Sequence, residues 1–143
     1  MKAILCRRFG PVDQLDYADV TPRPLRDEEV RVRVHAAGVN FPDSLKVEGQ
    51  HQIKPELPWV PGSETGGVVV EVGAGVSTLQ PGDRVMGVSD ARGGGSAKAR
   101  SCASTISCAK PPAMSFEEAA ATPVVYGTTL YALKQRGRTR PCR

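Results

Sequence analysis

Apolar and polar residues alternate most strictly between Glu29 and Val34, where every second residue is valine and the residues between are charged. A period of two predicts a half-buried antiparallel strand, with Val30, Val32 and Val34 facing the core. Alternation or valine-rich runs predict shorter strands elsewhere, at residues 2–9, 17–20, 66–72 and 85–88. The pattern therefore predicts a β-rich fold.

A short helix is predicted at residues 41–47. Asn40 is suited to the N-cap position, and Pro42 fits the first turn, where its missing N–H costs nothing.

Two further helices are predicted near the end of the chain. Ser115 and Glu118 have the spacing of a capping box, and alanines follow them. Thr122 and Pro123 then resemble an N-cap and a first-turn proline, which predicts a second helix through Lys134.

Composition limits the class of protein. The chain has 143 residues, of which 40% are hydrophobic and 24% charged, as expected for one domain with its own core. It has no apolar run of about 18 residues and no apolar N-terminal stretch of signal-peptide length, so a cytoplasmic protein without a membrane span is expected. The four cysteines form no CxxC pair, which argues against a disulfide framework or a zinc knuckle.

Charge is distributed unevenly. Residues 1–89 carry 10 Lys and Arg against 12 Asp and Glu, a net −2, whereas residues 90–143 carry 9 against 3, a net +6. A basic tail can bind nucleic acid, but no nucleic-acid-binding motif accompanies this one, so no such partner is predicted.

Four stretches carry a resemblance to a known family, namely residues 36–43 (AAGVNFPD), 61–69 (PGSETGGVV), 82–86 (GDRVM) and 114–121 (MSFEEAAA). Their order and spacing resemble the zinc-free quinone oxidoreductase branch of the medium-chain dehydrogenase/reductase superfamily. The resemblance implies a GroES-like, partly open β-barrel of the α+β class. It also implies NADPH-dependent reduction of quinones or enones by metal-free hydride transfer.

The resemblance divides the chain into a substrate-side domain at residues 1–113 and helices at 114–143 that begin the nucleotide-binding domain. The glycine-rich turn that would hold the pyrophosphate of NADPH is missing, so the chain is expected to be truncated before its Rossmann domain and inactive alone. A homodimer is expected only for a full-length protein. A non-catalytic GroES-like binding module and a decayed fragment remain the alternatives.

Residue chemistry argues against catalytic zinc. Zinc-dependent relatives place Cys where Asn40 stands and His where Ser63 stands, and a catalytic zinc needs about three nitrogen, sulfur or carboxylate ligands. Asn and Ser are poor ligands. Glu64 remains, but at the start of a glycine-rich strand it is better explained as a structural acceptor of backbone N–H groups.

The resemblance places Asn40 beside the nicotinamide ribose, and this role is compatible with a plain helix N-cap. Asp43, one turn later, could orient the Asn40 amide or stabilise the helix N-terminus electrostatically. In the last helix Thr129, or Thr128 if the register slips by one, would approach the cofactor. The alternative is a helix-interior threonine bonded to a backbone carbonyl.

Two residues are candidates for the substrate pocket. His51 stands where many relatives carry a pocket tyrosine and could donate a hydrogen bond to a quinone oxygen, although a solvent-facing loop histidine is the simpler interpretation. Trp59 could form a wall of the cleft, or it could serve packing alone.

Residues 96–110 lack periodicity at the place where the family has a strand. Moving the reading frame back by one base allows the sequence Phe-Gly-Glu-Gly-Ala-Val-Val-Arg-Glu-His-Asp-Leu-Leu-Arg-Lys, which restores a family-like strand. We therefore predict a compensated frameshift over this segment, and residues 137–143 are a candidate for a second shift.

Overall fold

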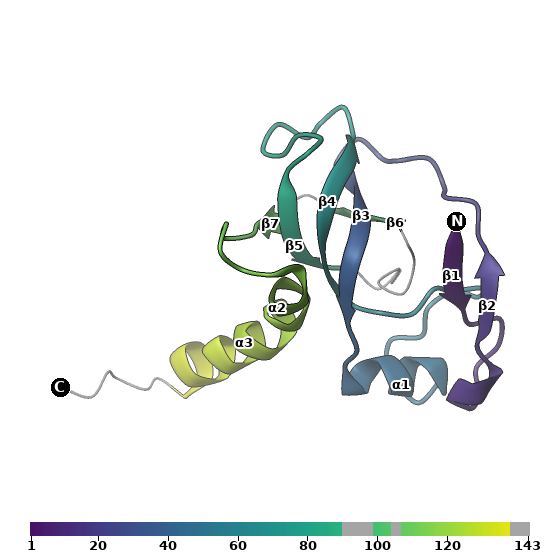
Figure 1. Cartoon of the computed structure of the whole chain (residues 1–143). Helices are drawn as coiled ribbons and strands as arrows, with labels where there is room; N and C mark the ends of the chain where they lie inside the picture. The colour runs from purple at the N-terminus through teal and green to yellow at the C-terminus, as the bar shows by residue number, and fades with distance from the viewer. Residues whose placement is uncertain (90–98, 104–106, 138–143) are drawn as a thin grey trace.

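The computed structural model describes residues 1–89, 99–103 and 107–137, which form two antiparallel sheets and short helices (Figure 1). The smaller sheet pairs β1 (Lys2–Leu5) with β2 (Asp16–Asp19), which the 3-10 turn η1 (Val12–Gln14) joins. The larger sheet has the strand order β6-β3-β4-β5-β7. Its strands are β3 (Glu29–Gly38), β4 (Glu64–Val72), β5 (Arg84–Val88), β6 (Ala99–Ala103) and β7 (Ser107–Ala109).

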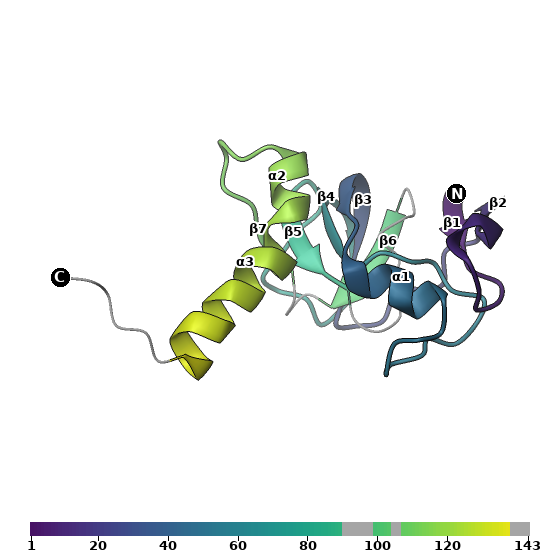
Figure 2. The ribbon, with the colours of Figure 1, turned by 90° about the horizontal axis from the view of Figure 1, so that it is seen from below.

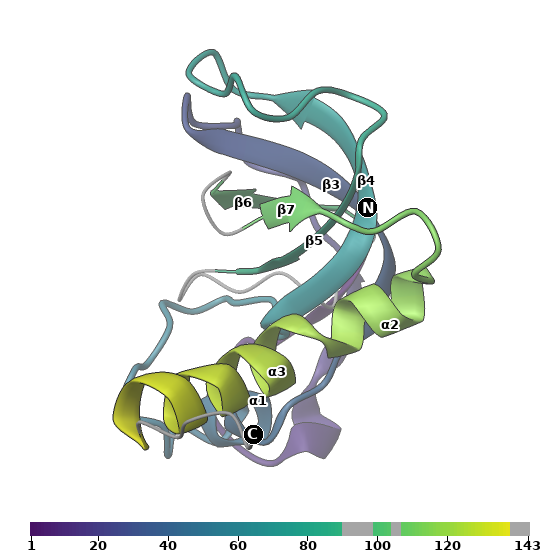
Figure 3. The same ribbon diagram turned by 90° about the vertical axis from the view of Figure 1, so that its left-hand side faces the viewer.

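The larger sheet curls so that its two edge strands, β6 and β7, approach each other. Its edge strands β6 and β7 are consecutive in the sequence, with only three residues between Ala103 and Ser107, so one edge must lie close to the other (Figure 3). Irregularities in the β3–β4 register fall between Arg31 and Val32 and again after Val34, and such bulges bend a strand. The predicted β-rich, partly open barrel is confirmed.

The core of the barrel comes from the alternating valines. Val30, Val32, Val69 and Val85 form one cluster in which no side chain is more than 2% exposed. Val34, near the middle of β3, is half-buried. The alternation in the sequence thus identifies the buried face correctly.

Helix α2 (Phe116–Ala121) lies directly on β4, because Gly66 has no side chain. A Cβ on Gly66 would lie 2.5 Å from the carbonyl oxygen of Phe116. The buried Ala119 and Ala120 complete this close contact. α2 therefore packs on the barrel itself, in front of the sheet in Figure 3.

The predicted capping box of α2 is present: Glu118 N–H donates to Ser115 Oγ, and Ser115 N–H donates to the Glu118 carboxylate. Thr122 stands at the predicted N-cap position before Pro123, but its side chain makes no capping hydrogen bond. Thr122 has helical dihedrals, and its hydroxyl donates back to the Glu118 carbonyl, so the chain passes from α2 into α3 (Pro123–Leu130) with little interruption. A π-helical turn, η3 (Tyr131–Arg136), follows and ends at Gly137.

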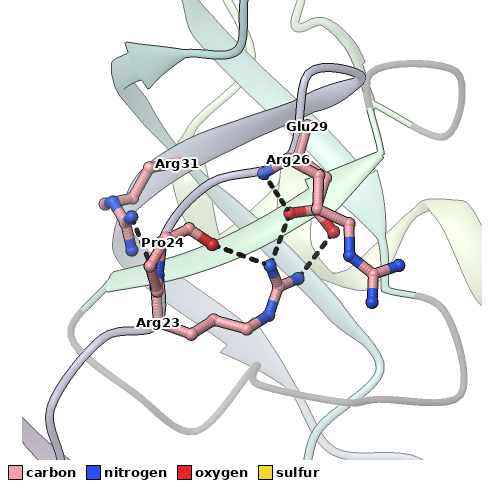
Figure 4. A network of polar contacts seen from close by, with 5 residues as sticks. All are labelled: Arg23, Pro24, Arg26, Glu29 and Arg31. Carbon is pink, nitrogen blue, oxygen red and sulfur yellow. Dashed lines mark hydrogen bonds and ion pairs between the residues drawn. The ribbon is translucent and has the colours of Figure 1, made fainter.

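A buried carboxylate fixes the connection between the two sheets (Figure 4). Glu29 is 1% exposed, and both its oxygens accept hydrogen bonds from the Arg23 guanidinium, at 2.6 and 2.7 Å. Arg26 N–H donates to the same carboxylate at 3.1 Å, and Arg31 donates to the Arg23 carbonyl at 3.0 Å. This network holds the proline-rich link 21–24 against the start of β3.

The irregular segment 96–110 contributes two strands where it is described. β6 sets Arg100 opposite Val32 and Cys102 opposite Val30, and β7 extends the sheet beyond β5. Residues 96–98 and 104–106 of the frameshift prediction lie outside the described residues, as do residues 138–143 of the tail. None of the helices in the described ranges is long and apolar enough to cross a lipid bilayer.

Candidate functional site

Asn40 lies where β3 ends and α1 (Phe41–Val47) begins, at the lower end of the barrel in Figure 1. As predicted, it is the N-cap residue, with extended dihedrals. Its side chain bonds outside the helix, however, since Nδ2 donates to Glu64 Oε1 at 2.8 Å. Its two neighbours are exposed apolar residues, Val39 at 88% and Phe41 at 75%.

Asp43 is buried one turn into α1 and holds two neighbours. Its Oδ2 accepts the backbone N–H of Asn40 at 3.0 Å, and its Oδ1 accepts the hydroxyl of Ser63 at 2.6 Å. Lys46 Nζ lies 3.4 Å from the same hydroxyl oxygen. Of the two roles considered for Asp43, the geometry matches stabilisation of the helix N-terminus, because the side-chain amide of Asn40 bonds to Glu64 and not to Asp43.

Glu64 is the second buried carboxylate of the site, with 2% of its surface exposed. Oε1 accepts the Asn40 amide, and Oε2 accepts the backbone N–H of Val124 in the first turn of α3, at 2.9 Å. The expectation that Glu64 accepts a backbone N–H group therefore matches the geometry, although the donor lies in a distant helix and not in its own strand.

The two threonines lie on the exposed part of α3. Thr129 Oγ1 donates to the carbonyl of Val125 at 2.9 Å, which is the arrangement of an ordinary helix-interior threonine, and Thr128 is exposed. Neither is joined to the Asn40 network by a hydrogen bond in the described residues. Their role in cofactor binding stays a prediction.

The pocket candidates lie apart from the network. His51 forms a local turn, in which its Nδ1 accepts the N–H of Ile53 at 3.0 Å. Trp59 is 4% exposed and packs with Cys6 and Val47 in a second core cluster, the geometry of a packing residue. Its indole N–H has no hydrogen-bond partner among the described residues.

The site as a whole is a polar chain that runs from Lys46 through Ser63, Asp43 and Asn40 to Glu64. Sequence reasoning found Asn40 and Asp43 but treated Ser63 only as a substituted zinc ligand and left Lys46 out. A signal was available, because positions 40, 43 and 46 lie on one face of a helix at spacings of three. The partners Ser63 and Glu64, at the start of β4, could not be found from local spacing.

The site offers no cluster of metal ligands. Across residues 1–89, 99–103 and 107–137, no three His, Cys, Asp or Glu side chains lie close enough to share a metal ion.

Lys110, which lies outside the polar chain, has a lowered pKa. Burial lowers the pKa of Lys110, and the nearby positive charge of Arg84 lowers it further. The Lys110 ammonium donates to the carbonyls of Pro111 and Met114 and lies 5.4 Å from the centre of the Phe116 ring. It therefore secures the turn that leads into α2.

Comparisons with known proteins agree with this architecture. Residues 26–129 match the alcohol dehydrogenase GroES-like domain family. The chain is 44% identical over 129 residues to quinone oxidoreductase-like protein 2 of Rattus norvegicus, an alignment that covers 89% of the chain and 36% of the relative.

Solved structures give the same result. Human synaptic vesicle membrane protein VAT-1 homolog-like protein has a TM-score of 0.92 at 31% identity, covering 98% of this chain and 44% of that one. The quinone oxidoreductase of Escherichia coli complexed with NADPH has a TM-score of 0.85 at 30% identity, covering 96% and 41%. The chain thus spans less than half the length of these proteins. It belongs to the alcohol dehydrogenase GroES-like domain family, as a domain of the quinone oxidoreductase type.

Proposed function

We propose that the protein to which this chain belongs reduces quinones or related enones with NADPH, without a catalytic metal. The observation that carries the proposal is the held carboxamide of Asn40, flanked by two exposed apolar side chains at the end of the barrel. The similarity to quinone oxidoreductases, one of them solved with NADPH, supports the same activity.

The described residues fit one part of NADPH. A fixed carboxamide can exchange hydrogen bonds with a ribose hydroxyl, while Val39 and Phe41 offer apolar surface to a flat ring. NADPH, when bound, would supply the hydride. A turn for its pyrophosphate is not among the described residues, so this part of the cofactor would need protein beyond them.

Metal-free reduction depends on positioning and hydrogen bonding, because no Lewis acid polarises the acceptor carbonyl. In our proposal Asn40 orients the nicotinamide side of the cofactor, and Asp43 fixes the backbone of Asn40. The apolar pair beside Asn40 excludes water from the reacting face. The preference for NADPH over NADH, the cytoplasmic location and the homodimer stay predictions.

The test is the rate of NADPH oxidation with a quinone acceptor, measured on the complete product of the gene and on its Asn40→Ala variant. Loss of one hydrogen bond of about 0.5–1.5 kcal/mol should lower kcat/KM by roughly 2- to 10-fold. Gln52→Ala, in the exposed loop after His51, is the control and should leave kcat/KM unchanged. If no quinone or enone supports NADPH oxidation by the complete product, the proposal is overturned and a non-catalytic binding module is favoured.

A further inference from the structure

Glu64 has two partners that belong to different parts of the molecule. One is the side-chain amide of Asn40, at the junction of β3 and α1, and the other is the backbone N–H of Val124, in the first turn of α3. The two carboxylate oxygens divide these partners between them, at 2.8 and 2.9 Å. A buried carboxylate that is bonded at both oxygens is held in one orientation.

The surroundings of Glu64 leave little room for another arrangement. Glu64 is paired with Gly38 in the β3–β4 ladder, and a Cβ on Gly38 would lie 2.5 Å from Glu64 Oε1. The carboxylate therefore occupies the space that a side chain at position 38 would need. With 2% of its surface exposed, Glu64 cannot exchange these partners for bulk water without a local opening.

We propose that Glu64 is a positioning residue that sets the orientation of the Asn40 amide and couples it to the first turn of α3. The inference rests on the proposed function, in which Asn40 contacts the cofactor. Helix α3 carries Thr128 and Thr129, so a single carboxylate joins the barrel side of the site to the helix that bears the other two predicted cofactor contacts (Figure 2). A displacement of α3 must then change the orientation of the Asn40 amide. A change at Asn40 must equally affect the first turn of α3, because energetic coupling is reciprocal.

Glutamine at position 64 is a specific probe of this arrangement. It has nearly the shape of glutamate, but its second terminal group is an NH2 donor. Asn40 and Val124 both present donors, so Glu64→Gln can satisfy one of them and must set two donors against each other at the other. The carboxylate of Glu71 provides a matched control: it lies on the same strand, is 54% exposed and pairs with Arg31.

The experiment measures hydrogen exchange by NMR on the 15N-labelled 143-residue chain. In Glu64→Gln, exchange should be about tenfold faster or more at whichever donor faces the new NH2 group, the Asn40 Nδ2 group or the Val124 amide, with core amides such as Val32 unchanged. A hydrogen bond to a charged group is worth about 1.5–3 kcal/mol, which converts to roughly 10- to 150-fold. Glu71→Gln should leave both sites as in the wild type.

A second variant keeps the test valid if Glu64→Gln fails to fold. Asn40→Ala leaves the carboxylate in place and removes one of its partners, so reciprocal coupling predicts a measurable change of exchange at Val124. The inference is overturned if Val124 does not respond to Asn40→Ala. It is also overturned if Glu64→Gln speeds exchange throughout the core, since that would mark a purely structural residue.

A further titration separates this inference from the proposed function. The probe is reduced nicotinamide mononucleotide, added to the wild-type chain and to Glu64→Gln while the Asn40 side-chain resonances are followed. Shifts in the wild type that weaken in the variant support both statements. If the exchange coupling is present but the nucleotide moves no Asn40 resonance, the coupling holds and the cofactor contact at Asn40 is contradicted.

Discussion

Replacing Gly38 by alanine tests the packing behind the site most severely. The new Cβ would lie 2.5 Å from Glu64 Oε1 and 2.7 Å from the carbonyl oxygen of Ala120. The first contact is with the Glu64 carboxylate, whose two oxygens are both hydrogen-bonded. The second is with the backbone of α2, where Ala120 is 2% exposed. Moving Glu64 would weaken its hydrogen bonds, and moving α2 would disrupt its packing on the barrel.

The size of the effect follows from these contacts. Overpacking of this kind costs about 1–3 kcal/mol, and a displaced Glu64 would also lose part of a hydrogen bond worth about 1.5–3 kcal/mol. We expect Gly38→Ala to lower the free energy of unfolding by about 2–4 kcal/mol. At roughly 3–4 °C per kcal/mol for a chain of this size, the Tm should fall by about 6–15 °C.

Thermal unfolding followed by circular dichroism measures this change, and Gly127→Ala is the matched control. Gly127 lies within α3, and a Cβ there would meet no atom within 4 Å, so alanine should raise stability by about 0.5–1 kcal/mol through helix propensity alone. If Gly38→Ala unfolds within about 1 kcal/mol of the wild type, the tight contact between Gly38, Glu64 and α2 is contradicted.

Three further substitutions have definite expected outcomes. Glu29→Gln removes the charge from a buried carboxylate whose partner Arg23 is 42% exposed. It should cost about 1.5–3 kcal/mol of unfolding free energy in chemical denaturation, the value of a hydrogen bond to a charged group, whereas a change below about 0.5 kcal/mol would refute the anchoring role. The double variant Asn40→Cys with Ser63→His should bind zinc with an affinity measurable by calorimetry, since it adds two good ligands beside buried carboxylates. Failure to bind zinc would show that the polar chain does not occupy a metal position. Arg100→Ala should raise the Tm, because the β3–β6 register sets position 100 opposite the core residue Val32. An unchanged or lower Tm would contradict that register and weaken the frameshift prediction.

Sequence reasoning located the elements well where the pattern is local. The alternation around Val32 identified the buried face, and the Asn40–Pro42 signal predicted residues 41–47, the helix that is observed. The Thr122–Pro123 signal placed the start of the last helix correctly, although the Thr122 hydroxyl bonds back to the Glu118 carbonyl instead of capping that helix.

The site was harder to predict because its bonds connect distant segments. The pair formed by Asn40 and Glu64 joins the N-cap of α1 to the start of β4, and the contact with Val124 depends on how α3 is placed against the barrel. No spacing in the sequence encodes such contacts. The resemblance to a known family located Asn40 and the residues suggested a structural role for Glu64, but only the fold showed that Glu64 holds the Asn40 side chain.

The most direct test of the central claim is NADPH oxidation by the complete gene product after exhaustive treatment with a metal chelator. We predict that oxidation requires a quinone or enone acceptor, proceeds at the same rate before and after chelation, and is not increased by added zinc. Activity that disappears with the chelator and returns with zinc would contradict metal-free hydride transfer at the Asn40 site.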